Sequence, residues 1–238
     1  MMSFGTLYLL PVPLTENAGL KSFTPYLSET INSIREYIVE NEKTARRFLK
    51  EAGLTIPQNE LIIHDYGKHN RGADQSEFIG GLLKGADVGL MSEAGCPGIA
   101  DPGSDIVALA HKKGIRVVPL VGPSSILLAL MASGFNGQSF TFHGYLPIDK
   151  GARTKRLKEL EGMSDRFNQT QIFIETPFRN NQLLEEILRS CHPQSQLCVA
   201  CNLTADDELV QTRTVAEWKK QVPDLHKKPA IFLLFKKS

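Results

Sequence analysis

The chain has 238 residues, of which 42% are hydrophobic and 22% charged, a balance typical of a soluble globular protein with one large domain or two small ones. Its 27 basic and 26 acidic residues leave a net charge of +1, so any contact with nucleic acid must come from a local basic patch. No apolar run approaches the ~20 residues of a membrane span. Residues 1–4 lack the basic region and the long apolar core of a signal peptide, so we expect a cytoplasmic protein.

The first half of the chain alternates short apolar runs with segments of helical period, which is typical of a parallel sheet covered by helices. The expected strands are residues 5–10, 37–39, 60–63, 88–91 and 115–120. The expected helices are residues 27–34, 41–52, 76–83 and 124–132. Because ligands of such sheets bind beyond the carboxyl ends of the strands, the loops that follow the strands are the candidate binding elements.

Two loops of small residues follow neighbouring apolar runs, at residues 92–98 (SEAGCPG) and 122–125 (GPSS). Gly95 and Gly98 can adopt positive φ, and Pro97 stiffens its loop. We interpret the two loops as the walls of one pocket. No GxGxxG or Walker lysine motif occurs in the chain, so this pocket suits a compact neutral or cationic ligand better than a triphosphate. Ordinary tight turns are the alternative interpretation.

Polar groups at the starts of two helices belong to the same region. Asp101 lies in a DPGSD segment that can begin the helix after the first loop, with an oxygen-bearing cap and acids in its first turn. Ser124 and Ser125 offer hydroxyls and free N–H groups where the second helix begins.

His64 follows the expected strand 60–63 and is adjacent to Asp65. A carboxylate can orient an imidazole and raise its basicity, so His64 is a candidate general base. The polar segment that follows contains Lys68 and Arg71, which could contact a phosphate backbone. An exposed polar loop without function is the alternative.

A Gly-Phe-Asn-Gly break at residues 134–137 predicts a domain boundary, with an N-terminal α/β domain at 1–134 and a C-terminal α/β domain with a mixed sheet at 138–238. The strands expected in the second domain are residues 139–142, 170–174, 196–202, 208–214 and 231–235. We therefore predict an α/β fold of two domains, the first with a mainly parallel sheet.

The densest basic run of the chain contains Lys150, Arg153, Lys155 and Arg156, with few acids among them. It is the candidate RNA contact, although a solvated helix face explains the pattern equally well. The Cys198-x-x-Cys201 pair has no second CxxC partner, and its apolar flanks predict a strand on which the two cysteines point to opposite faces. We therefore expect reduced thiols and no metal site.

Residues 92–103 (SEAGCPGIADPG) resemble the Ser-Asp-Ala-Gly-Thr-Pro…Asp-Pro-Gly signature of the tetrapyrrole methylase superfamily. The resemblance continues through residues 114–119 (GIRVVP) and 142–147 (FHGYLP), and it reaches 5–13 at the start and 175–179 (ETPFR) further on. Within that superfamily, the chain is most similar to the ribose 2′-O-methyltransferases of small-subunit ribosomal RNA.

The resemblance implies a homodimeric methyltransferase that uses S-adenosylmethionine, with the donor site in the cleft between the two domains. It implies donor contacts from Pro11, Glu93, Gly95, Pro97, Asp101, Ser124, Ser125, Asn202, Pro229 and Ala230. For a ribose hydroxyl of ribosomal RNA as acceptor, His64 is the candidate base, with Glu175 behind it.

Two alternatives remain open on the sequence. One is a methyltransferase for a small molecule such as a tetrapyrrole, which the near-neutral charge mildly favours. The other is a catalytically silent protein that binds S-adenosylmethionine. The related RNA enzymes carry Glu-Asp-Thr-Arg where this chain has ENEK at 40–43, and Arg-Glu where it has CN at 201–202, so the acceptor chemistry can differ.

Overall fold

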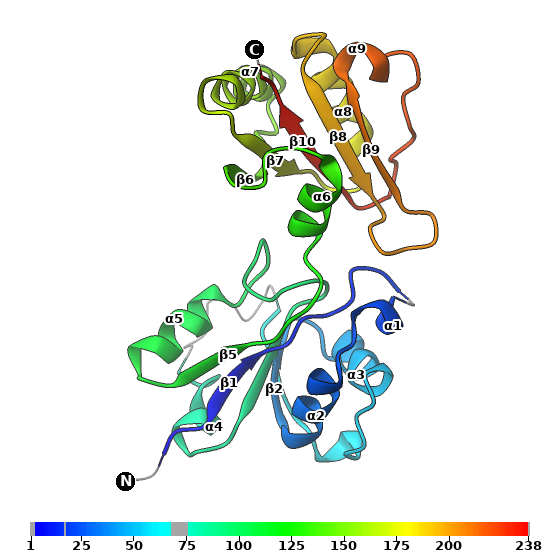
Figure 1. Cartoon of the computed structure of the whole chain (residues 1–238). Helices are drawn as coiled ribbons and strands as arrows, with labels where there is room; N and C mark the ends of the chain where they lie inside the picture. Colours follow the sequence, from blue (N-terminus) through cyan, green and yellow to red (C-terminus); the bar gives the residue numbers. More distant parts are fainter. Residues whose placement is uncertain (1–2, 17, 68–75, 238) are drawn as a thin grey trace. The chain divides into compact units, whose positions relative to one another are not determined.

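The computed structural model describes residues 3–16, 18–67 and 76–237 of the chain. These fold into two compact units, Met1–Ser124 and Ser125–Ser238, each built on a five-stranded sheet (Figure 1). The predicted α/β fold with two sheets is confirmed. Among the described residues, no helix has the length and apolar character that crossing a membrane requires.

The sheet of the first unit is parallel, with the strand order β3-β2-β4-β1-β5. Its strands are β1 (Thr6–Leu9), β2 (Glu36–Val39), β3 (Ile62–Asp65), β4 (Val88–Met91) and β5 (Arg116–Pro119). Strands β2 and β4 are buried along their whole length, which explains why β4 is a continuous apolar run. The carboxyl ends of β4, β1 and β5 are therefore neighbours at one edge of the sheet.

Helices pack on both faces of this sheet. They are α1 (Gly19–Ser22), α2 (Pro25–Ser33), α3 (Glu42–Glu51), α4 (Gly80–Leu83) and α5 (Ser104–Lys112), with a 3₁₀ turn at Gln58–Glu60. Consecutive residues of β2 enter two different apolar clusters, because Tyr37 packs with Phe48 and Leu49 of α3 while Ile38 packs with Leu82 and Ile106. This alternation gives the unit its two hydrophobic layers.

Helix α4 is shorter than the expected helix 76–83, because residues 76–79 form turns. Gly80 and Gly81 lower the helix propensity of this segment. Gly81 also lies against the carboxylate of Glu36, since an added Cβ would lie 2.0 Å from its Oε2. The glycine that lowers the helix propensity therefore also leaves room for the Glu36 carboxylate.

The sheet of the second unit is mixed, with the order β6-β7-β10-β8-β9, and only β6 and β7 are parallel. Its strands are β6 (Phe140–Tyr145), β7 (Thr170–Ile174), β8 (Gln196–Cys201), β9 (Leu209–Thr214) and β10 (Ala230–Phe235). Its helices are α6 (Ser125–Ser133), α7 (Lys150–Phe167), α8 (Asn180–Ser190) and α9 (Val215–Trp218). Phe173, Phe232 and Trp218 form the centre of its core. Cys201 enters that core and Cys198 does not, and all four cysteines of the chain are free.

Helix α6 belongs to the second unit rather than the first. It contacts β8, β9 and β10, and the Thr212 hydroxyl donates a hydrogen bond of 2.8 Å to the Ser133 carbonyl. The division between the units therefore lies at residues 124–125, whereas the sequence placed it after this helix, at 134–138. The Gly-Phe-Asn-Gly break ends α6 but does not separate the two units.

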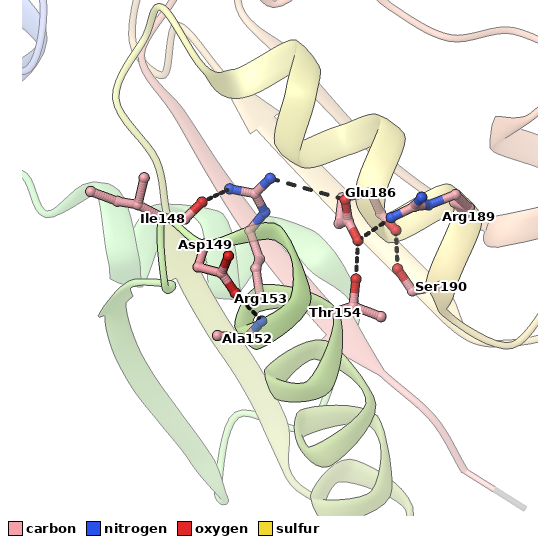
Figure 2. A network of polar contacts seen from close by, with 8 residues as sticks. All are labelled: Ile148, Asp149, Ala152, Arg153, Thr154, Glu186, Arg189 and Ser190. Atoms are coloured by element: carbon pink, nitrogen blue, oxygen red, sulfur yellow. Dashed lines mark hydrogen bonds and ion pairs between the residues drawn. The ribbon is translucent and has the colours of Figure 1, made fainter.

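A buried polar network joins α7 to α8 (Figure 2). The Glu186 side chain, only 4% exposed, accepts hydrogen bonds from the Thr154 hydroxyl and from Arg189 Nη2 at 2.5 Å. Arg153 Nη2 lies 4.0 Å from the other carboxylate oxygen, and Arg153 Nη1 donates to the Ile148 carbonyl at 3.2 Å. The network fixes the start of α7 against the middle of α8.

Replacing Glu186 by leucine should lower the free energy of unfolding by about 3 kcal/mol, because Arg153 then stays buried without its carboxylate partner. Urea denaturation measures the change. The matched control is Glu159→Leu, which removes the exposed ion pair of 3.2 Å with Arg156 and should cost less than about 1 kcal/mol. Equal losses in the two variants would contradict a structural role for the network.

Candidate functional site

Three loops of the first unit are joined directly to one another at the carboxyl edge of its sheet. Val12, after β1, and Gly95, after β4, exchange two backbone hydrogen bonds of 2.9 and 2.8 Å. The Cys96 thiol donates to the Pro123 carbonyl, after β5, over 3.4 Å. Burial raises the pKa of Cys96, so the thiol keeps its proton and acts as the donor. The two loops that the sequence predicted as walls of one pocket are thus in contact.

Close backbone packing explains two of the glycines in these loops. Gly95 has a φ of +75°, which favours glycine over other residues. At Gly122, an added Cβ would lie 2.1 Å from Pro11 Cγ. The loops after β1 and β5 therefore meet through a proline ring and a bare backbone.

The predicted residues of the loop after β4 lie in different surroundings. Pro97 is buried and Asp101 is half-buried in the turn before α5, where the Gly98 N–H donates to the Pro102 carbonyl at 3.1 Å. Glu93 is exposed, but its carboxylate accepts a hydrogen bond of 2.5 Å from the Thr44 hydroxyl of α3.

The start of α3, where residues 40–43 differ from the related RNA enzymes, is a part of the site to which sequence reasoning assigned no ligand contact. Asn41 caps the helix by accepting from the N–H groups of Lys43 and Thr44, and Glu40 accepts from the Glu93 N–H at 3.3 Å. A pocket of about 250 Å³ lies between this helix, residues 12–16 and the loop after β4. Thr44, Phe48 and Glu93 contribute to its lining, and so does Arg47, which pairs with Glu16 at 3.0 Å. The pocket therefore combines hydroxyl, aromatic, acidic and basic groups.

In the second unit, the predicted residues Asn202, Pro229 and Ala230 lie together at one edge of the sheet. Cys201 pairs with Ala230 and Ile174 pairs with Ile231, so the ends of β7 and β8 meet the start of β10. The Asn202 N–H donates to the Pro229 carbonyl at 3.0 Å. Ser125 is the first residue of α6, and Ser124 ends the first unit.

Glu175 follows β7 at this edge and is buried in an ion pair. Its Oε1 accepts from Arg179 Nη2 at 2.7 Å and from the Thr176 N–H at 2.6 Å. A carboxylate held by a guanidinium and a backbone donor is suited to fixing the turn between β7 and α8.

His64 has a different carboxylate partner from the one that the sequence suggested. Its Nε2 lies 2.8 Å from Glu36 Oε1, whereas Asp65 Oδ1 accepts from the Gly67 N–H. His64 pairs with Ile38 in register, so Glu36, two residues earlier on β2, lies on the same face. The partner is 28 residues away in sequence, and no local pattern reveals it. Lys68 and Arg71 lie outside the described residues.

The predicted basic contact on α7 is only partly available to a ligand. Arg153 is buried in the network of Figure 2, and Arg156 is bound to Glu159 and to His143. Lys150 and Lys155 remain exposed. The helix therefore presents fewer free cations than its sequence indicates, because α8 and β6 bind two of its four predicted charges.

The imidazole of His143 lies between two side chains that determine its tautomer. Arg156 Nη2, which can only donate, lies 3.2 Å from Nδ1, so Nδ1 accepts and Nε2–H donates to Gln171 Oε1 at 2.7 Å. Burial, opposed by the Gln171 hydrogen bond and assisted by the Arg156 charge, lowers the pKa of His143 below its ordinary value.

Comparisons with known proteins agree on one family. A family model described as Tetrapyrrole (Corrin/Porphyrin) Methylases matches residues 16–219. A protein named Ribosomal RNA small subunit methyltransferase I from Vibrio cholerae is 32% identical over 89% of this chain and 69% of its own length. A protein of the same name from Xylella fastidiosa is 31% identical over 93% of this chain and 77% of its own. The crystal structure of the methyltransferase CobJ has a TM-score of 0.63 at 17% identity, covering 98% of this chain and 94% of that one, and it shows the same fold.

Gly122→Ala should lower the free energy of unfolding by about 2 kcal/mol, because the new methyl group must displace Pro11 and separate the loops. Gly137→Ala is the matched control, since no atom lies within 4 Å of an added Cβ there. Urea denaturation of the two variants tests the contact, which a stable Gly122 variant would contradict.

The stability of the protein should decrease as the pH falls below the ordinary value of 6.5 for histidine. The unfolded chain then binds a proton that folded His143 still excludes, so protonation favours unfolding until the pH reaches the lower pKa of the folded state. Urea midpoints between pH 7.5 and 5 measure the effect. His143→Gln should flatten this part of the profile, and an unchanged slope would contradict the assignment.

Proposed function

Because the chain belongs to the tetrapyrrole (corrin/porphyrin) methylase family, we propose that it transfers a methyl group from S-adenosylmethionine to a ribose 2′-hydroxyl of small-subunit ribosomal RNA. The proposed acceptor rests on one observation. The chain is 32% identical, over 89% of its length, to a protein named Ribosomal RNA small subunit methyltransferase I. The likeness to CobJ, at 17% identity, concerns the fold alone and gives the tetrapyrrole alternative no comparable support.

The loops of the first unit fit a donor of this kind. S-adenosylmethionine supplies a methyl group on a positively charged sulfur. The joined loops around Pro11 and Gly95 offer peptide groups, and they contribute the carboxylates of Glu16 and Glu93 to the pocket, which Arg47 of α3 also lines. A neutral to acidic environment suits a cation, and alignment of donor and acceptor is the main help that such a transfer needs.

We assign donor contacts to the residues that the resemblance implies. In the first unit they are Pro11, Glu93, Gly95, Pro97, Asp101 and Ser124. In the second unit they are Ser125, Asn202, Pro229 and Ala230.

The ribose oxygen loses its proton when it gains the methyl group, and we assign that proton to His64. Glu36 holds Nε2 of the imidazole, which leaves Nδ1 to accept the proton. We assign Glu175 a positioning role, since its carboxylate already binds Arg179 and the Thr176 N–H. A homodimer and a cytoplasmic location are part of the proposal.

The proposed activity is tested with labelled S-adenosylmethionine and small-subunit ribosomal RNA from cells that lack this protein. Label should enter the RNA and remain on the ribose after digestion to nucleosides, and RNA from cells that contain the protein should accept little. Transfer to a tetrapyrrole but not to RNA would overturn the acceptor. Calorimetric binding of the donor without any transfer would favour the silent alternative.

His64→Gln should reduce kcat about 100-fold or more and leave the affinity for S-adenosylmethionine unchanged, because a general base contributes that range of rate. Glu36→Gln should give a smaller loss, since the imidazole remains. Unchanged turnover with a lower Tm in His64→Gln would show that the His64–Glu36 pair is structural.

A further inference from the structure

An exposed aromatic side chain projects from the turn between β7 and α8. Phe178 is 66% exposed, and its ring lies 6.1 Å from that of His226 in an edge-to-face arrangement at 76°. His226 is itself exposed. A phenyl ring with so little packing contributes little to the core, so its position calls for another explanation.

The backbone around Phe178 is held in place by a second segment of chain. The Lys227 N–H donates to the Pro177 carbonyl at 3.0 Å, and Asn180 Nδ2 donates to the Lys228 carbonyl at 2.6 Å. The buried ion pair of Glu175 fixes the same turn from inside. The ring is therefore presented on a rigid support, which reduces the entropy lost when a ligand binds it.

The adjacent segment carries two lysines and one acid. Lys227 is exposed and Lys228 is half-buried, and neither forms an ion pair with another residue in the described part of the chain. The closest acid in sequence, Asp224, is bound by Asn181 Nδ2 at 2.7 Å and by the His226 N–H at 3.0 Å. We call Phe178, His226, Lys227 and Lys228 the aromatic–basic surface.

We propose that the aromatic–basic surface binds a single-stranded segment of the acceptor RNA, with a base stacked on Phe178 and a phosphate beside Lys227. Unpaired bases stack on exposed aromatic rings, and lysines neutralise the phosphates between them. The inference rests on the proposed function, and it assigns the RNA contact to this surface instead of to α7.

The position of the surface favours this assignment. Lys228 precedes Pro229 and Ala230, at the sheet edge where the second unit carries its proposed donor residues. Helix α7 offers a comparison, because Phe167 is 55% exposed with Arg166 at 5.2 Å from its ring centre. Phe167 precedes β7 whereas Phe178 follows it, so Phe167 lies at the opposite edge of the same sheet.

The test measures the affinity of the full chain for a fluorescent single-stranded segment of small-subunit ribosomal RNA, by anisotropy over a series of salt concentrations. Phe178→Ala should weaken binding about tenfold, and Phe178→Tyr should retain it, because stacking needs the ring. Lys227→Gln should reduce the slope of log affinity against log salt by about 0.7. The matched controls Phe167→Ala and Lys155→Gln should bind as the unaltered chain does.

Three results would overturn the inference. The first is unchanged RNA affinity in Phe178→Ala and Lys227→Gln while Lys155→Gln binds weakly, which would return the contact to α7. The second is a change in solution mass of Phe178→Ala with unaltered RNA affinity, which would make the surface a contact between copies of the chain. The third is an unaltered chain that binds S-adenosylmethionine but no RNA, and this result alone also overturns the proposed acceptor.

Discussion

The organisation of the first unit depends on the direct contact between loops that follow adjacent parallel strands. Parallel strands place their carboxyl ends side by side, but the loops beyond them need not touch. Here the Val12–Gly95 hydrogen bonds and the packing of Gly122 on Pro11 bring them together. Small residues are required at these points, because a Cβ at Gly122 would occupy the space of the proline ring.

In the second unit, the ends of the strands are held together by a different kind of contact. Its edge is built from strands that run in opposite directions, so a strand start at Ala230 lies beside a strand end at Cys201. Three side chains then fix the turn after β7. Glu175 binds Arg179 and the Thr176 N–H, and Asn180 binds the segment before β10. Side chains, rather than bare backbone, hold this edge together.

Much of the fold was predictable from local patterns, because most strands are short and rich in apolar residues and are bounded by glycine, proline or polar residues. The two small-residue loops were also visible, since residues at strand ends are local in sequence. What the sequence did not reveal depends on distant partners. Arg153 pairs with Glu186 on another helix, and His64 pairs with Glu36 on another strand. Helix α6 joined the second unit because its partners, β8 to β10, come later in the chain.

The paired hydrogen bonds between Val12 and Gly95 have a consequence for the motions of the first unit. They form a two-residue antiparallel bridge at the end of a parallel sheet, and neither loop can move away without breaking both bonds. Amide protons at the two positions should therefore report one common opening free energy, set by a single opening event. Any molecule that binds one of these loops would also slow amide-proton exchange in the other. Binding at one loop would then stabilise the second loop without a change in its structure.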